Sequence, residues 1–223
     1  MARRAFVVEM AGPAGSGKST VSRVLTARPR VVGASVWNLP RPLYAAGAVR
    51  TLPAIGALIG AARGLPREEA AQLIRLDALD LFLRRLPEHG RSVVVLDEGP
   101  VFAFAWLRVL GHPCFRDARQ DVWWDRTLTH WAARLDGIVL LDGADPLLVD
   151  RLRSRAKSHP LKDSSDEALY EFAAAYRREF AWVIAELTAR GGPKVVALES
   201  NGAPPEELAE RVLAACQETV HAE

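Results

Sequence analysis

Short apolar runs alternate with longer amphipathic segments along the whole chain. Five runs have the continuous apolar character of strands buried on both faces. These predicted strands are Phe6–Met10, Val31–Val36, Val93–Leu96, Ile138–Leu141 and Val195–Leu198. The segments between them carry apolar residues at helical spacing, so the pattern predicts strands and helices in alternation.

The predicted helices follow the strands in turn. They cover Thr20–Ala27, two pieces within Leu43–Leu86 that are interrupted around Gly64-Leu65-Pro66, Val101–Leu110, Gln120–Leu135, a segment beginning at Asp145, a long helix ending before Gly191, and Pro204–Val220. Ser164 and Glu167 have the spacing of a capping box at the start of the long helix. No hairpin signal joins neighbouring strands, so we expect a parallel sheet with helical crossovers on both faces. The prediction is one three-layer α/β domain over residues 1–223.

Composition narrows the class of protein. The chain has 223 residues, of which 49% are hydrophobic and 25% charged, and its formal charge is only +2. This balance lacks the basic field that nucleic-acid binding requires. The longest uncharged stretch, Thr51–Ala62, is shorter than the roughly 20 apolar residues of a membrane span. We therefore expect a cytoplasmic protein with no nucleic-acid or membrane partner.

The two cysteines, Cys114 and Cys216, are too few for a disulfide framework. Neither lies near a helix start with a basic partner, which argues against thiol chemistry. The histidines show no metal-ligand spacing, so we expect no zinc site.

A phosphate-binding motif follows the first predicted strand. Residues 12–19 read Gly-Pro-Ala-Gly-Ser-Gly-Lys-Ser and match G-x-x-x-x-G-K-[ST] between a strand and a helix. The glycines let backbone N–H groups turn toward phosphate oxygens, and the next helix adds the positive end of its dipole. We expect Lys18 to act on the β- and γ-phosphates and Ser19 to ligate Mg²⁺. The predicted nucleotide-binding residues are Gly12, Gly15, Ser16, Gly17, Lys18, Ser19 and Thr20.

Two acidic residues close the third predicted strand. Asp97 and Glu98 stand before Gly99-Pro100, which forces a sharp exit from the strand. Ligands of open α/β sheets bind at the carboxyl edge of the strands, where both carboxylates would lie. Asp97 continues the strand register and is the predicted second metal ligand, with Ser19. Glu98 is the candidate to accept a proton from the phosphate acceptor, although either carboxylate could be the base.

A basic segment follows the fourth predicted strand. It contains Arg151, Arg153, Arg155, Lys157, His159 and Lys162. A solvated helix face would explain such a run, but arginines at this edge also neutralise charge during phosphoryl transfer. At helical spacing Arg151 and Arg155 share a face, and we expect both to be catalytic.

The motif at 12–20, the acidic strand end at 97–99 and the arginines from Arg151 onward resemble the nucleoside and nucleotide kinase branch of P-loop proteins. That group includes thymidylate, adenylate and deoxynucleoside kinases. The resemblance implies a five-stranded parallel sheet in the order 2-3-1-4-5. It also implies a lid after the fourth strand, at residues 145–163. The implied activity is transfer of the γ-phosphate of ATP, with Mg²⁺, to a small acceptor.

Two positions depart from this family. Many relatives carry Asp-Arg where this chain has Asp97-Glu98, and deoxynucleoside kinases place an acid after the second strand, where this chain has Ser35-Val36-Trp37-Asn38. The acceptor site should lie between the helices after strands two and three. Its candidate residues are Trp37, Arg41, Tyr44, Arg50, Arg63, Trp106, Trp123, Trp124 and Trp131.

Within that set, the stripe Trp124, Leu128, Trp131 and Leu135 is predicted to be core. The neighbouring polar stripe, Trp123, Thr127, His130 and Arg134, could instead face a ligand.

The leading hypothesis is therefore a Mg-ATP-dependent kinase acting on a nucleoside or nucleoside monophosphate. A kinase of a sugar, antibiotic or other metabolite stays open, as does a P-loop NTPase that acts as a switch. The interpretation also leaves room for a homodimer.

Overall fold

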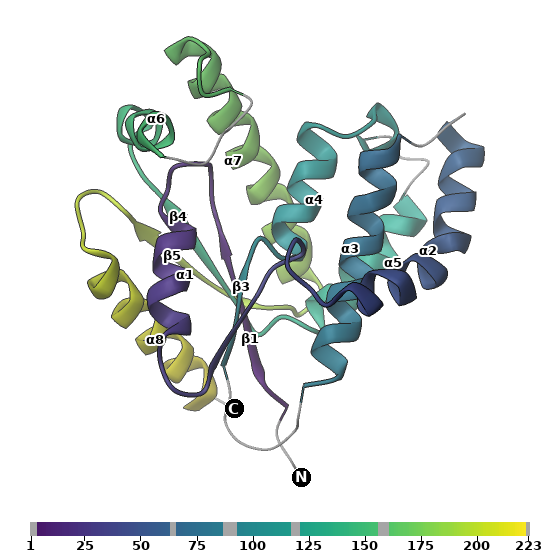
Figure 1. Cartoon of the computed structure of the whole chain (residues 1–223), viewed down its shortest axis with the longest axis horizontal. Coiled ribbons are helices and arrows are strands. Elements are labelled where there is room, and N and C mark those ends of the chain that lie inside the picture. The colour runs from purple at the N-terminus through teal and green to yellow at the C-terminus, as the bar shows by residue number, and fades with distance from the viewer. Residues whose placement is uncertain (1–3, 63–65, 87–92, 117–120, 156–160, 222–223) are drawn as a thin grey trace.

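Five parallel strands form the centre of the structure, in the order β2-β3-β1-β4-β5 (Figure 1). This order confirms the predicted 2-3-1-4-5 sheet. The computed structural model describes residues 4–62, 66–86, 93–116, 121–155 and 161–221. The strands are β1 (Phe6–Ala11), β2 (Val31–Ala34), β3 (Val93–Asp97), β4 (Gly137–Asp142) and β5 (Lys194–Glu199).

Because every described strand pair is parallel, the carboxyl ends meet at one edge of the sheet. Met10 of the central strand β1 is in register with Asp97 of β3 and with Val139 of β4. The loop after β1, the acidic end of β3 and the end of β4 are therefore neighbours. This edge is the place where open α/β sheets bind ligands.

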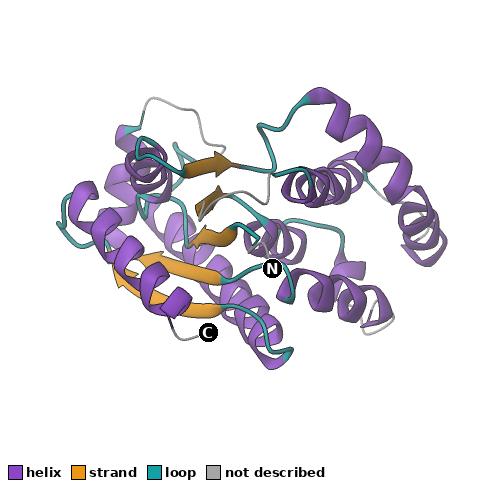
Figure 2. Ribbon diagram, turned by 90° about the horizontal axis from the view of Figure 1, so that it is seen from below, coloured by secondary structure: helices purple, strands orange, loops and turns teal. Residues whose placement is uncertain are grey.

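Helices cover both faces of the sheet, as Figure 2 shows from below. On one face lie α1 and α8, and the other face carries α4 and α7 with α2, α3 and α5 beyond them (Figure 1). The helices are α1 (Lys18–Thr26), α2 (Arg41–Ala62), α3 (Arg67–Arg84), α4 (Pro100–Val109), the 3₁₀ turn η1 (Pro113–Arg116), α5 (Asp121–Ala132), α6 (Asp145–Ser154), α7 (Asp166–Ala189) and α8 (Pro205–His221). The predicted three-layer architecture is confirmed.

Successive strand residues alternate between two hydrophobic clusters. Val7 and Val94 belong to the large cluster under α4 and α7, whereas Val8 and Val95 pack against α1 and α8. This alternation follows from the period of two in side-chain direction along a strand. It explains why these strands are apolar at nearly every position.

Several element ends differ from the sequence prediction. The first helix begins at Lys18 instead of Thr20, because Gly17 takes a left-handed conformation (φ 94°) and caps it. Strand β2 ends at Ala34 instead of Val36; its last partner is Leu96, and the chain leaves the extended conformation at Glu98 (φ 66°), just after β3. The cap of α7 is Ser165 and not Ser164, since the Ser165 hydroxyl accepts the Ala168 N–H at 3.3 Å.

The predicted interruption within 43–86 separates α2 from α3, with Pro66 at the N-cap of α3. Its residues Gly64 and Leu65 lie outside the described residues. Among the helices that the structure describes, none is both long enough and apolar enough to cross a membrane.

Candidate active site

The loop at residues 12–17 wraps between the end of β1 and the start of α1. Gly12, Gly15 and Gly17 all have positive φ, at 140°, 86° and 94°. A Cβ atom on Gly12 would lie 2.0 Å from the carbonyl oxygen of Leu141, and one on Gly15 would lie 2.3 Å from that of Leu148. Glycine at both positions therefore allows the loop to pack closely against the chain that leaves β4.

Lys18 folds back over this loop. Its Nζ donates to the carbonyl oxygens of Gly12 (2.7 Å) and Pro13 (2.9 Å). Burial lowers the pKa of the Lys18 ammonium, while the negative charges of Asp97 and Glu98 act in the opposite direction. The Lys18 ammonium thus contacts the loop carbonyls and is within electrostatic reach of both acidic residues at the end of β3.

Ser19 and Thr20 lie exposed in the first turn of α1, beside this point. Asp97 Oδ1 is buried and has no hydrogen-bond partner among the described residues. A buried carboxylate oxygen without a partner is costly, and a bound cation would satisfy it. Carboxylate and hydroxyl oxygens are the ligands that Mg²⁺ prefers. The Ser19 and Asp97 pair therefore fits the metal predicted from the sequence.

Glu98 follows Asp97 in a left-handed conformation that is rare for a residue with a side chain. Its carbonyl oxygen accepts the Val36 N–H at 3.1 Å. Its carboxylate is an electrostatic neighbour of Lys18 and of Tyr176 on α7. Burial raises the pKa of the Tyr176 hydroxyl, and the charge of Glu98 raises it further. The Glu98 carboxylate is therefore within electrostatic reach of both Lys18 and α7.

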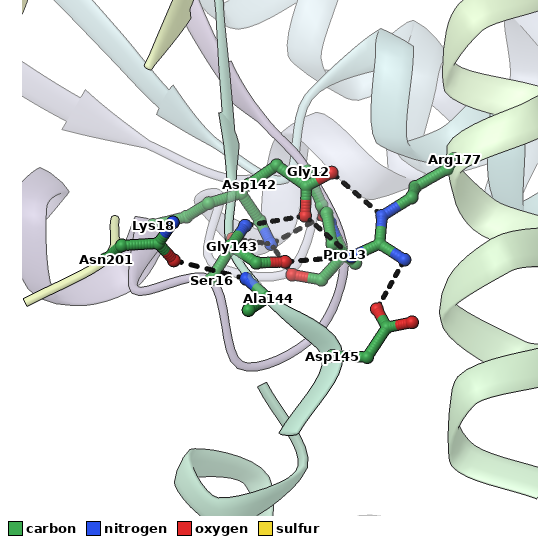
Figure 3. A network of polar contacts seen from close by, with 10 residues as sticks. All are labelled: Gly12, Pro13, Ser16, Lys18, Asp142, Gly143, Ala144, Asp145, Arg177 and Asn201. Atoms are coloured by element: carbon green, nitrogen blue, oxygen red, sulfur yellow. Dashed lines mark hydrogen bonds and ion pairs between the residues drawn. The ribbon is translucent and has the colours of Figure 1, made fainter. Parts of the chain in front are cut away.

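Arg177 of α7 joins the end of β4 to the start of α6 (Figure 3). Its guanidinium forms two bonds to the Asp142 carboxylate, at 2.8 and 3.0 Å, and one to Asp145 Oδ1 at 2.5 Å. It also donates to the Gly143 carbonyl oxygen at 3.0 Å. Asp142 is itself an electrostatic neighbour of Lys18. The network fixes the first residue of α6 next to the glycine loop.

The predicted catalytic arginines have different neighbours. The Arg151 guanidinium donates to the hydroxyl (3.0 Å) and carbonyl oxygen (2.9 Å) of Ser200, in the loop after β5. Helix α6 ends at Ser154, and Arg155 follows in an extended conformation as an electrostatic neighbour of Lys18. Arg155 is thus within electrostatic reach of Lys18.

Two other basic residues of this segment also have partners within the protein. Arg153 forms an ion pair with Asp166 at the start of α7 (2.6 Å), and Lys162 donates to the Arg155 carbonyl oxygen at 2.8 Å. Lys157 and His159 lie outside the described residues.

On the candidate acceptor side, Trp37 and Tyr44 come from the loop after β2 and the first turn of α2. Trp37 is 46% exposed, and the guanidinium carbon of Arg75 lies 3.9 Å above its ring. Arg75 also donates to Gln72 Oε1 at 3.1 Å. Gln72 is only 1% exposed, yet its Nε2 has no partner among the described residues. A buried amide NH₂ group without a partner is suited to donate a hydrogen bond to an oxygen or nitrogen atom of a ligand.

Other candidates on the acceptor side have structural partners. Arg50 reaches Asp80 and Asp77, Arg41 lies exposed at the start of α2, and Arg63 lies outside the described residues. Trp124, Leu128, Trp131 and Leu135 are buried, which confirms the predicted core stripe. The polar stripe beside it turns toward α3, because His130 and Arg134 contact Asp80 at 3.0 and 3.2 Å.

Sequence reasoning missed four residues of this region: Glu9, Gln72, Tyr176 and Arg177. Gln72 and Tyr176 lie within apolar helical stripes that predict only core. Glu9 had a signal, since it interrupts the apolar run of the first strand. Burial raises the pKa of the Glu9 carboxyl to about 8, and three backbone N–H groups that donate to it act against this rise.

Comparisons with known proteins agree with this architecture. No protein-family model matches the sequence, and none of the curated proteins is detectably similar to it in sequence. Among solved structures, deoxyadenosine kinase from M. mycoides with bound dCTP superposes with a TM-score of 0.54 and 13% identity, covering 94% of this chain and 100% of that one.

The same enzyme with bound dATP gives a TM-score of 0.54 and 12% identity, over 94% of this chain and 100% of that one. With the products dCMP and a flexible dCDP, it gives 0.55 and 12%, over 96% and 99%. The fold is that of the P-loop kinases. Nearly the whole chain superposes on deoxyadenosine kinase, so the two proteins share this fold.

Proposed function

We propose that this protein is a Mg-ATP-dependent kinase that transfers the γ-phosphate to a hydroxyl group of a nucleoside. The observation that carries the proposal is that Lys18, bonded to the carbonyl groups of the glycine loop, lies within electrostatic reach of Asp97 and Glu98. The fold shared with deoxyadenosine kinase supports a nucleoside as acceptor. Trp37, with Arg75 and Gln72 beside it, offers a flat surface and hydrogen-bonding groups to a base.

In the proposed reaction, backbone N–H groups of the glycine loop and the Lys18 ammonium bind the phosphates of ATP. Ser19 and Asp97 would hold Mg²⁺, which would neutralise charge on the phosphates. Glu98 accepts the proton as the acceptor oxygen bonds to the γ-phosphorus, and the bond to the β-phosphate oxygen breaks to leave ADP. Arg155 adds positive charge beside the transferring group.

The direct test is transfer from γ-labelled ATP to panels of ribonucleosides, deoxynucleosides, nucleoside monophosphates and sugars. We expect a labelled nucleoside monophosphate, and slow ATP hydrolysis when no acceptor is present. Transfer only to a sugar or to another metabolite would replace the nucleoside with that acceptor. Rapid hydrolysis that no acceptor changes would favour an NTPase switch instead.

Asp97 and Glu98 are expected to fail in different ways when their charges are removed. Asp97→Asn should raise the Mg²⁺ concentration needed for half-maximal activity, because the metal loses a charged ligand. Glu98→Gln should lower turnover by about 10²–10⁴-fold with little change in Mg²⁺ dependence, because the proton acceptor is lost. Mg²⁺ titrations of initial rates separate the two effects. The reverse pattern would exchange the roles, and normal turnover in both variants would rule out chemistry at this strand end.

The segment 145–163 is proposed to act as a lid over the phosphates. Its helix α6 packs on α7 through Val149, Leu152 and Leu169, and Arg177 anchors its root. Closure would exclude water from the transferring phosphate. We expect slower hydrogen exchange at residues 145–155 and 161–163 when Mg-ATP and acceptor are both bound. Equal exchange in the free and bound protein would remove the lid from the proposal.

A further inference from the structure

Glu9 is a fully buried acidic residue in the central strand of the sheet. It lies three positions before the glycine loop, between β3 and β4, and its exposed fraction is 0%. Burying a carboxyl group in a hydrophobic core costs free energy unless its oxygens are hydrogen-bonded. Its location therefore calls for specific partners.

Among the described residues, the hydrogen-bond partners of the Glu9 carboxyl group belong to the turn that follows Asp97 and Glu98 and to the start of α4. Oε1 accepts the N–H groups of Gly99 (3.0 Å) and Phe102 (2.9 Å), and Oε2 accepts that of Val101 (2.9 Å). These N–H groups belong to the start of α4, where the N-cap residue Gly99 has no side chain to accept them. Glu9 thus caps α4 from a different strand, because its oxygens accept N–H groups that the helix itself leaves without partners.

The same bonds flank the left-handed residue Glu98. The Glu98 carbonyl oxygen is held by the Val36 N–H, and the next peptide N–H, that of Gly99, is held by Glu9. The left-handed conformation costs about 1–2 kcal/mol for a residue with a side chain, so surrounding contacts must maintain it. The bond to Glu9 is one of these contacts.

The left-handed turn matters for the direction of the two carboxylates. Successive side chains on an extended strand point to opposite faces of the sheet. Here Asp97 and Glu98 are both electrostatic neighbours of the Lys18 ammonium. The change of backbone direction at Glu98 accounts for this convergence. Close approach also needs Gly99, because a Cβ atom there would lie 2.8 Å from Glu9 Cδ.

We propose that Glu9 is a positioning residue, which holds the turn after β3 and thereby fixes the place of Asp97 and Glu98 at the edge of the sheet beside the glycine loop. The inference rests on the proposed phosphotransfer function for its catalytic consequence. Its structural part, the restraint of the turn by a buried carboxylate, can be measured without any acceptor.

The first variant is Glu9→Gln, which keeps the shape but places an amide NH₂ against backbone donors. A second variant, Gly99→Ala, keeps the carboxylate and forces a methyl group against it. The matched control is Asp80→Asn, another buried carboxylate, whose described partners lie on α2, α3 and α5. If Glu9 only stabilised the fold, all three variants would lose stability, ATP binding and kcat in the same proportion.

Three measurements on the full-length variants and the wild-type protein test the role of Glu9. They are hydrogen exchange at the Gly99, Val101 and Phe102 amides, Mg²⁺-dependent ATP binding by calorimetry, and kcat and KM for phosphate transfer. For both turn variants we expect faster exchange at these amides and weaker Mg²⁺-dependent ATP binding. We also expect kcat to fall about tenfold or more, the factor that loss of one hydrogen bond gives, with the acceptor KM nearly unchanged. Asp80→Asn should lower thermal stability but keep wild-type kcat and Mg²⁺ dependence at a temperature where it is folded.

Wild-type exchange and Mg²⁺-dependent ATP binding in both turn variants would overturn the inference. So would equal losses in the Asp80→Asn control, because they would make the effect one of general stability. If the wild-type protein phosphorylates no acceptor, the proposed function fails, while exchange and ATP binding still decide the role of Glu9. If Glu9→Gln does not fold, Gly99→Ala still tests the inference, because its methyl group disturbs the same contact between Gly99 and Glu9.

Discussion

Lys18→Ala is expected to lower phosphate transfer by about 10²–10³-fold or more, the usual effect of removing one preorganised electrostatic group. The Lys18 ammonium lies over the glycine loop, bonded to the Gly12 and Pro13 carbonyl oxygens and close to the carboxylates of Asp97 and Glu98. Alanine leaves the loop backbone intact but removes the charge that would face the transferring phosphate. Steady-state rates with labelled ATP measure the loss.

The fold should survive this change, since the lysine's own partners are carbonyl groups at the mouth of the loop. Lys194→Ala is the matched control, because Lys194 is an exposed lysine at the start of β5, opposite to the loop's edge of the sheet. We expect wild-type rates for the control and similar melting temperatures for all three proteins. Unchanged turnover in Lys18→Ala would remove the loop from the mechanism.

Asp80→Asn should have the largest effect on stability, at about 2–4 kcal/mol of unfolding free energy. Asp80 is 2% exposed, and three arginines and a histidine contact its carboxylate: Arg50, Arg84, Arg134 and His130. Asparagine would remove the negative charge that these side chains share. Urea unfolding of variant and wild type measures the difference.

The pH dependence of this difference has a definite sign. Burial acts to raise the pKa of Asp80, but the bonds from His130 and Arg84 and the charge of Arg134 outweigh it and hold the pKa well below its usual range. A lowered pKa in the folded state contributes stability above the unfolded value, near pH 4, and loses it as the pH falls. The gap between variant and wild type should therefore narrow from pH 7 to pH 3.

Asp125→Asn provides the control for this stability measurement. Asp125 pairs with Arg190 but is 72% exposed, so its loss should change stability by less than about 1 kcal/mol. Equal losses at Asp80 and Asp125 would mean that the cluster around Asp80 contributes no more than a surface ion pair.

The sequence predicted the sheet because its signals are local. Apolar runs with helices between them, and no hairpin turns, allow few topologies other than a parallel sheet. The glycine loop was recognisable for the same reason, since its chemistry lies within eight consecutive residues. The acidic end of β3 also needed only a strand followed by Gly99-Pro100. The predicted start of the first helix and end of the second strand were wrong by two residues each, next to the positive-φ residues Gly17 and Glu98.

The basic segment shows where local spacing is insufficient. Arg151 and Arg155 are one helical turn apart in sequence, but the structure gives them Ser200 and the surroundings of Lys18, respectively. The polar stripe with His130 and Arg134 looked suited to a ligand, and α3 supplies Asp80 to it instead. These partners are distant in sequence: Arg151 and Ser200 are 49 residues apart, and His130 and Asp80 are 50 apart.

By itself, then, the sequence determined the order of elements, the parallel sheet and the place of the glycine loop, because each depends on the character of neighbouring residues. Only the tertiary structure decided which charges meet. Glu9 and the turn at Gly99 are 90 residues apart, and Arg177 and Asp142 are separated by 35. Such pairs form because parallel strands bring distant segments to one edge of the sheet, and buried charged and polar groups then need partners there.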